Sequence, residues 1–155
     1  MTDNTSGTRQ PDAALRALDR LVGTWQISGD ATGSVTYRWL DGGFFLAQEG
    51  ELELYGHRNT FTEIIGRERP FGGESSDDIK ARTSSAEGDT LDYVYELDGD
   101  TLTIWGGQRG SDSYFKGTFS ADGNSLRGVW TWPGGGYETT STRQPDAAPS
   151  RRKER

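Results

Sequence analysis

The hydrophobic positions change their period once along the chain, at Gly23. Before it, apolar residues recur at the spacing of one helix face, at Leu15, Leu18, Leu21 and Val22. Pro11 and Asp12 precede this run, and both residue types are typical of a helix N-terminus. From Gly23 onward apolar and polar residues alternate, which is the period of a half-buried β-strand. The pattern therefore predicts one short N-terminal helix followed only by strands.

Turn signals divide the alternating part into segments of even length. These signals are Asp41-Gly42, Asp98-Gly99, Asp122-Gly123 and Pro133-Gly134. The predicted strands cover residues 22–30, 33–40, 43–55, 60–69, 78–85, 90–97, 100–107, 112–121, 125–132 and 136–143. Sequential strands with one polar face predict an all-β fold, a single up-and-down antiparallel barrel of about nine or ten strands. Closure into a barrel removes the exposed edges of such a meander.

The predicted turns can be checked against the side chains that they bring opposite one another. With two-residue turns, the facing pairs are Trp39–Phe44 and Tyr37–Leu46 in the first hairpin, Tyr95–Leu102 and Tyr93–Ile104 in the second, and Phe119–Leu126 and Phe115–Trp130 in the third. Apolar residues meet apolar residues in all three hairpins. A slip by one residue would expose them, so this agreement supports the meander.

Length and charge limit the classes of function. The 155 residues suit one domain, and we expect a disordered arm over 1–10, the barrel over 11–143 and a disordered basic tail over 144–155. The net charge is -7, which argues against binding to nucleic acid. No apolar run has the roughly 20 residues of a membrane span, and no signal peptide is recognisable. We therefore expect a cytoplasmic monomer or homodimer that binds neither membranes nor nucleic acid.

The segment Leu-Val-Gly-Thr-Trp at 21–25 lies between the predicted helix and the first strand. Its placement resembles the Gly-x-Trp signature of the calycin barrels, which include lipocalins, fatty-acid-binding proteins and nitrobindin-like proteins. The resemblance implies that Gly23 and Trp25 belong to the closed end of the barrel. It also implies that a basic residue of the last strand, Arg143 here, stacks on Trp25.

Residues 18–143 also resemble a group of uncharacterised, lipocalin-like bacterial proteins. The shared features are the Gly-Thr-Trp start, Trp-Leu-Asp-Gly-Gly-Phe-Phe, Gly-Asp-Thr-Leu-Thr-Ile-Trp and Trp-Pro-Gly-Gly-Gly-Tyr. Nitrobindin-like proteins bind haem through a histidine in their C-terminal part, and this chain has no histidine after His57. Haem is therefore disfavoured, and we expect no cofactor. The chain has no cysteine and no metal-ligand spacing, so we expect no metal site either.

A barrel of this size either fills its interior with side chains or holds one small ligand. The predicted inner face is rich in aromatic residues, and buried Tyr and Trp need hydrogen-bond partners. Such a lining suits a hydrophobic or aromatic ligand with some polar groups, although the same residues could pack as ordinary core. The candidate ligand-binding residues are Tyr37, Trp39, Phe44, Gln48, Phe61, Tyr93, Tyr95, Ile104, Phe115 and Trp130.

The fourth predicted strand has the most unusual pattern. Phe61 and Ile65 define its inner face, and the same alternation places Glu63 and Arg67 inside. A buried pair of charges is costly unless it is hydrogen-bonded, so it would need a reason. One interpretation is a ligand-orienting or acid–base pair deep in the barrel. The other is a bulge at Gly66 that turns one or both side chains outward.

His57 is the only histidine and is expected in a turn near the barrel mouth. It would need an orienting carboxylate to act as a general base, and otherwise it is a solvated loop residue. The first candidates for catalysis are Glu63, Arg67, Tyr95 and His57, together with Tyr93. No motif for a serine nucleophile, phosphate loop or dinucleotide site is present.

Three functions remain open at this point. The first is binding of one small hydrophobic or aromatic molecule in the lumen. The second is a cofactor-free enzyme of the cyclase or isomerase type in the same cavity. The third is a structural or dimerising protein with a filled interior. The pattern also leaves open the strand register around Gly50 and Gly66.

Overall fold

The computed structural model describes residues 9–145; residues 1–8 and 146–155, most of the two predicted terminal arms, lie outside the described residues. A short helix, α1 (Ala13–Arg16), continues into a 3-10 turn, η1 (Ala17–Leu21). Ten strands follow: β1 (Gly23–Gly29), β2 (Ala31–Trp39), β3 (Phe45–Leu54), β4 (His57–Gly66), β5 (Ile79–Ser85), β6 (Thr90–Asp98), β7 (Thr101–Gly106), β8 (Tyr114–Phe119), β9 (Ser125–Trp132) and β10 (Gly135–Arg143). Each predicted strand is present, with its ends shifted by at most three residues.

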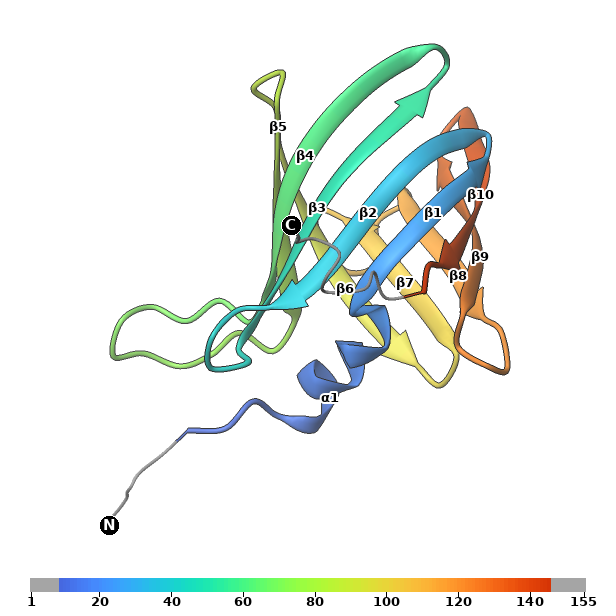
Figure 1. The fold of residues 1–155 in the computed structure, drawn as a ribbon. Coiled ribbons are helices and arrows are strands. Elements are labelled where there is room, and N and C mark those ends of the chain that lie inside the picture. The colour runs from blue at the N-terminus through green and yellow to red at the C-terminus, as the bar shows by residue number, and fades with distance from the viewer. Residues whose placement is uncertain (1–8, 146–155) are drawn as a thin grey trace, which may run out of the picture.

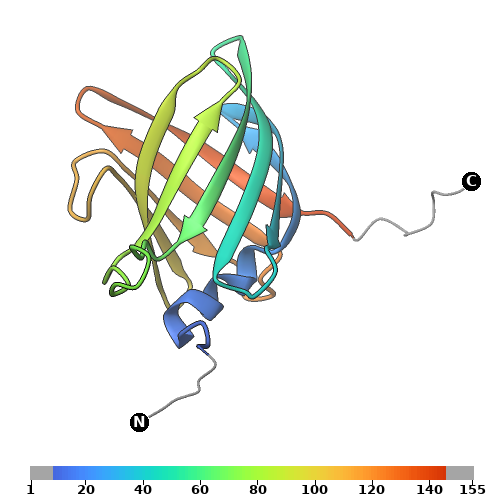
Figure 2. The same cartoon turned by 90° about the vertical axis from the view of Figure 1, so that its left-hand side faces the viewer.

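The ten strands form one closed antiparallel barrel. Each strand pairs with the next one in the sequence, and β1 pairs with β10 to complete the ring. The helix lies below one end of the barrel, and the β3–β4 and β9–β10 turns lie at the opposite end (Figures 1 and 2). The predicted up-and-down barrel with a short N-terminal helix is confirmed. This architecture fits a calycin-like fold in general.

Two of the predicted hairpin registers are wrong by two residues. In the first hairpin Trp39 faces Leu46 and Tyr37 faces Gln48, because the connection between β2 and β3 is longer than a two-residue turn. In the second hairpin Tyr95 faces Ile104. A shift by two residues preserves the face on which each paired side chain lies, so inward residues within the strands, such as Tyr37 and Tyr95, were still identified correctly.

The cause of the second shift is the position of the turn. Asp98 pairs with Thr101, so the turn residues are Gly99 and Asp100 rather than Asp98 and Gly99. The third hairpin has the predicted register, with Phe119 opposite Leu126. The pairing continues without interruption through Gly50 in β3 and Gly66 in β4. The predicted alternative is therefore right about one side chain, Arg67, which points outward, but wrong about the cause, because there is no bulge at Gly66.

The helix closes one end of the barrel with apolar side chains. Asp12 caps α1 by accepting a hydrogen bond from the Leu15 backbone N–H at 3.1 Å. Leu15, Leu18 and Leu21 are at most 2% exposed and pack into the same core as Trp25. The Trp25 indole N–H donates to the Leu21 carbonyl at 2.8 Å, which joins the helix to the start of β1.

Arg143 holds the closed end together from the other end of the chain. Its guanidinium lies over the Trp25 ring, with its central carbon 4.3 Å from the ring centroid. The same group donates hydrogen bonds to the carbonyls of Val22 and Arg20. Gly23 has a φ of +125°, and a Cβ there would lie 2.8 Å from the Arg143 guanidinium, so the absence of a side chain leaves room for this contact.

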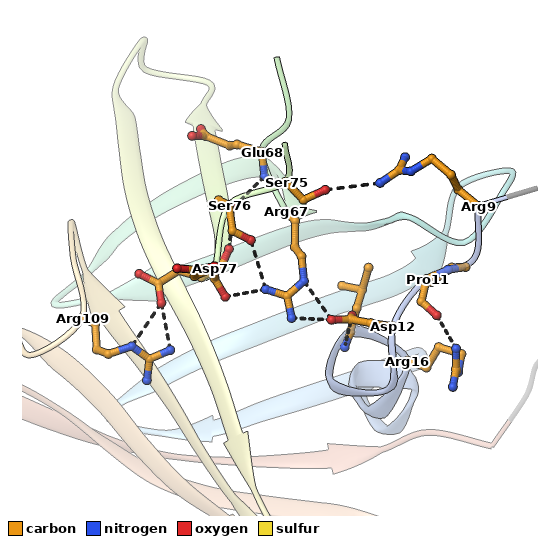
Figure 3. A network of polar contacts seen from close by, with 12 residues as sticks. Arg9, Pro11, Asp12, Arg16, Arg67, Glu68, Ser75, Ser76, Asp77 and Arg109 are labelled. Atoms are coloured by element: carbon orange, nitrogen blue, oxygen red, sulfur yellow. Dashed lines mark hydrogen bonds and ion pairs between the residues drawn. The ribbon is translucent and has the colours of Figure 1, made fainter. Parts of the chain in front are cut away.

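A second arginine fastens the helix from outside the barrel. Arg67 follows the last residue of β4 and donates to the Asp12 carboxylate at 2.6 Å and to backbone carbonyls of Ser76 and Asp77 (Figure 3). The prediction that Arg67 lies beside Glu63 is therefore wrong. Its physical reason is that β4 ends at Gly66, and the alternation of faces ends with it. Within residues 9–145, no helix is both long and apolar enough to cross a membrane.

The Arg143 contacts generate a prediction about stability. Replacing Arg143 with Ala leaves the half-buried carbonyls of Val22 and Arg20 without this donor and removes the cover of the Trp25 ring. We expect the free energy of unfolding to fall by about 2–4 kcal/mol, measured by urea denaturation. Arg127→Ala, which removes an exposed arginine from the outer face of β9, is the control and should change stability by less than about 0.5 kcal/mol. Equal effects of both substitutions would contradict this role of Arg143.

Candidate ligand-binding cavity

The barrel is hollow. It encloses a cavity of about 620 Å³, to which all ten strands contribute lining residues. The cavity extends from Leu21 and Trp25 at the closed end to Tyr55 and His57 at the other end. Tyr55 is 75% exposed, so the cavity reaches solvent at this mouth. Its volume lies within the range of roughly 300–1,000 Å³ that is common for small-molecule sites.

The lining is polar on one side and apolar on the other. The strands β6 to β9 contribute only aromatic and aliphatic side chains: Leu91, Tyr93, Tyr95, Leu102, Ile104, Phe115, Leu126 and Trp130. Polar side chains concentrate on β3, β4 and β5, which provide Gln48, His57, Asn59, Glu63, Thr83 and Ser85. The lumen can therefore contact an apolar molecule along one wall and hydrogen-bond it along the other.

Most of the predicted ligand-binding residues line this cavity. They are Tyr37, Gln48, Phe61, Tyr93, Tyr95, Ile104, Phe115 and Trp130. Trp130 packs between two other aromatic rings, with centroid distances of 5.8 Å to Tyr93 and 5.5 Å to Phe115. These contacts hold the aromatic wall in place without filling the lumen.

Trp39 and Phe44 were predicted in the lining but lie outside it. Trp39 is the last residue of β2, and its indole N–H donates to the Asp19 carboxylate at 2.8 Å. Phe44 belongs to the longer β2–β3 connection, and the Arg9 guanidinium lies 5.1 Å from its ring centroid. Both residues are therefore at the closed end of the barrel, because the connection is not the tight turn that the sequence pattern indicated.

Glu63 is the centre of the polar side. It is 3% exposed, and the prediction that it points inward is confirmed. Its Oε1 accepts hydrogen bonds from Gln48 Nε2 at 2.5 Å and Tyr95 Oη at 2.6 Å. Its Oε2 accepts from Thr83 Oγ1 at 2.8 Å. Gln48 and Thr83 face Glu63 across the two neighbouring strands, so the sheet register itself assembles this cluster.

Burial and hydrogen bonding act on the acidity of Glu63 in opposite directions. Burial raises the pKa of Glu63, and the hydrogen bonds from Tyr95, Thr83 and Gln48 oppose that rise. The surrounding phenols stay neutral, because burial and then the nearby Glu63 charge raise the pKa of Tyr93 to about 12 and raise that of Tyr37 further. Within this cluster the Glu63 carboxyl, rather than a phenol, is thus the group that can exchange a proton.

The five candidates for catalysis do not form one cluster. His57 lies at the mouth, where its Nε2 is 2.7 Å from the Glu87 carboxylate. It is separated from Glu63 by six residues of β4, about 20 Å along an extended strand. Arg67 is outside the opposite end of the barrel. Only Glu63 and Tyr95 are in contact, through a hydrogen bond. Acid–base chemistry could therefore involve this pair, but not Arg67 or His57.

Polar residues near the cavity that the sequence analysis did not single out include Thr83, Asn59 and Glu87. Thr83 could have been found, because Ile79 and Ala81 define the inner face of its strand. Asn59 was missed because the strand was predicted to start at residue 60, three residues after its observed start at His57. Its Oδ1 is buried and has no hydrogen-bond partner among residues 9–145. Glu87 lies in the β5–β6 turn, where no periodicity indicates which way a side chain points.

Comparison with known proteins assigns no relative. No protein-family model matches the chain, and no curated protein matches it at a significant level. Within the part of the chain that the structure describes, no three or more His, Asp or Glu side chains form a group that could hold a metal ion. The functional argument therefore rests on the geometry and chemistry of the cavity.

The raised pKa of Glu63 generates a prediction about pH and stability. In the unfolded chain Glu63 loses its proton near its ordinary pKa of 4.5, whereas the folded protein keeps this proton to higher pH. Between the two pKa values unfolding releases a proton, so the free energy of unfolding falls as pH rises. Glu63→Gln removes this contribution.

Urea denaturation of both proteins between pH 4 and 9 measures the effect. We expect the stability of the unmodified protein, relative to Glu63→Gln, to fall as pH rises above about 4.5 and then to level off. All other carboxylates are present in both proteins, so the difference isolates Glu63. If the stability of the unmodified protein relative to Glu63→Gln instead rose with pH, the pKa of Glu63 would be lowered in the folded protein. The hydrogen bonds to Glu63 would then outweigh the effect of burial, and the prediction would be contradicted.

Proposed function

We propose that this protein binds one small, predominantly hydrophobic or aromatic molecule in the lumen of its barrel. The observation that carries the proposal is the cavity of about 620 Å³ with an aromatic wall and an opposing polar wall. A purely structural barrel would gain stability by filling this space, because interiors normally pack densely. The buried Asn59 Oδ1 without a partner supports the same conclusion, since a bound molecule could donate to it.

The proposal includes a relationship of this chain to the lipocalin-like proteins of the calycin group. The stacking of Arg143 on Trp25 and the close approach of Arg143 to Gly23 support a correspondence with the calycin Gly-x-Trp signature. On this proposal the protein is a cytoplasmic bacterial binder that is monomeric or homodimeric. Its partner is the small molecule, rather than nucleic acid or a membrane, and it works without haem or another cofactor.

A cofactor-free enzyme is the second candidate, and the contact between Glu63 and Tyr95 favours it. A buried carboxyl group with a raised pKa can accept or donate a proton in an apolar pocket, which is the requirement for general acid–base catalysis. The substrate would be a molecule of the same class with an acidic C–H bond, and the reaction would be an isomerisation or cyclisation started by proton transfer.

Occupation of the lumen can be tested with N-phenylnaphthylamine, a neutral dye whose fluorescence increases in apolar surroundings. Ser141 lines the cavity, so Ser141→Trp should occupy part of it and weaken dye binding by at least about 10-fold. The neighbouring Thr142 is exposed on the outer face, so Thr142→Trp should bind the dye as the unmodified protein does. Equal binding by all three proteins would place the dye outside the barrel and contradict the proposal.

The enzyme alternative predicts exchange of a carbon-bound proton. We expect the protein to accelerate deuterium uptake from D₂O into the methyl group of acetonaphthone, measured by mass spectrometry, if Glu63 acts as a general base. Glu63→Gln should reduce the accelerated rate by about 100-fold or more. Binding of the ketone with no acceleration above the solvent rate would leave the protein as a binder only.

A further inference from the structure

Within residues 9–145, the lining of the lumen contains an acidic side chain and no basic lysine or arginine side chain. Among the cavity-lining residues in the described part of the chain there is no lysine or arginine, and Glu63 is the acidic residue among them. The single histidine of the lining is His57, which lies at the mouth and is already paired with Glu87. A ligand that reaches the inner end therefore meets a carboxyl group without a cationic side chain beside it.

The neighbours of Glu63 are arranged for its ionised form. Gln48, Thr83 and Tyr95 all donate hydrogen bonds to its two oxygens. A carboxylate has about four acceptor positions, so one remains, on Oε2, which accepts from Thr83 alone. Glu63 itself lines the cavity, so a donor on the ligand would take this remaining position. What the cluster lacks is a positive charge.

An organic cation would supply that charge. A buried carboxylate is costly when it stands alone, and an ammonium group beside it offsets that cost through strong attraction in a low-dielectric site. The rings of Tyr37 and Phe61 line the same cavity and can face a cation with their π-electrons. A neutral donor gains only a hydrogen bond, and a carboxylate ligand is repelled. The net charge of -7 further favours the approach of cations.

We infer that the lumen selects an organic amine, with its protonated nitrogen at Glu63 and its aromatic or aliphatic body extending toward the mouth. This inference rests on the proposed function and names its ligand class. The position of Glu63 defines the orientation, because Glu63 lies three residues from the closed-end terminus of β4 and six from the mouth. The body of the ligand then lies against the aromatic wall formed by Tyr93, Phe115 and Trp130.

Three probes with the same naphthyl body and different head groups test the inference. Isothermal titration calorimetry at neutral pH with naphthylethylamine, naphthylethanol and naphthylacetate should rank the amine first. We expect the amine to bind at least about 10-fold more tightly than the alcohol, which corresponds to about 1.4 kcal/mol, and the acetate to bind most weakly. This ranking is measured on the unmodified protein and does not depend on any variant folding correctly.

Two variants test whether Glu63 causes the preference for the amine. Glu63→Gln keeps the shape of the side chain and removes its charge, so the amine should lose its advantage while the alcohol binds as before. Glu49→Gln makes the same change in net charge on the exposed outer face of β3 and should retain the preference. Equal binding of the acetate and the amine, or an unchanged preference in Glu63→Gln, would overturn the inference and leave the proposed function standing. Failure of all three probes and of N-phenylnaphthylamine to bind would overturn both.

Discussion

The pairing of β1 with β10 is the constraint on which the rest of the structure depends. It joins the first strand of the meander to the last, and Trp25 lies directly opposite Arg143 in that ladder. The same two residues stack at the closed end, so the contact that closes the ring of strands also seals its floor. Leu15, Leu18 and Leu21 then cover this floor from outside. With the barrel sealed at one end by a compact core, the lumen above it can stay hollow.

Because the lumen is hollow, the buried Glu63 lines a space that a ligand can enter. Three neighbouring strands bring Gln48, Glu63 and Thr83 level with one another, and Tyr95 completes the hydrogen bonding. Such a cluster is expensive to build in an apolar interior, and it makes no contact that seals the closed end. An acceptor deep in an aromatic cavity is instead the arrangement that orients a ligand, whether or not a proton is then transferred.

The alternation of apolar and polar residues made the strands and most of the cavity-lining residues predictable from the sequence. Side chains on a strand alternate between two faces, so Phe61 and Ile65 were enough to place Glu63 inside. This held even though two of the three predicted hairpin registers were wrong by two residues. The same rule failed for Arg67, Trp39 and Phe44, which lie at or beyond strand ends, where alternation stops. No sequence pattern gives the size of the lumen, since that depends on how ten strands tilt and on which rings pack together. The contact of His57 with Glu87 joins a strand start to a turn and carries no periodic signal.

A crystal structure of the complex with N-phenylnaphthylamine tests the central claim most directly. The account predicts electron density for one dye molecule inside the barrel, packed against Tyr93, Phe115 and Trp130, with the hydrogen bonds of Glu63 to Gln48, Thr83 and Tyr95 intact. A lumen filled by rearranged side chains, with the dye absent or bound on the outer surface, would contradict it. That result would return the protein to the class of barrels whose interior serves only their own stability.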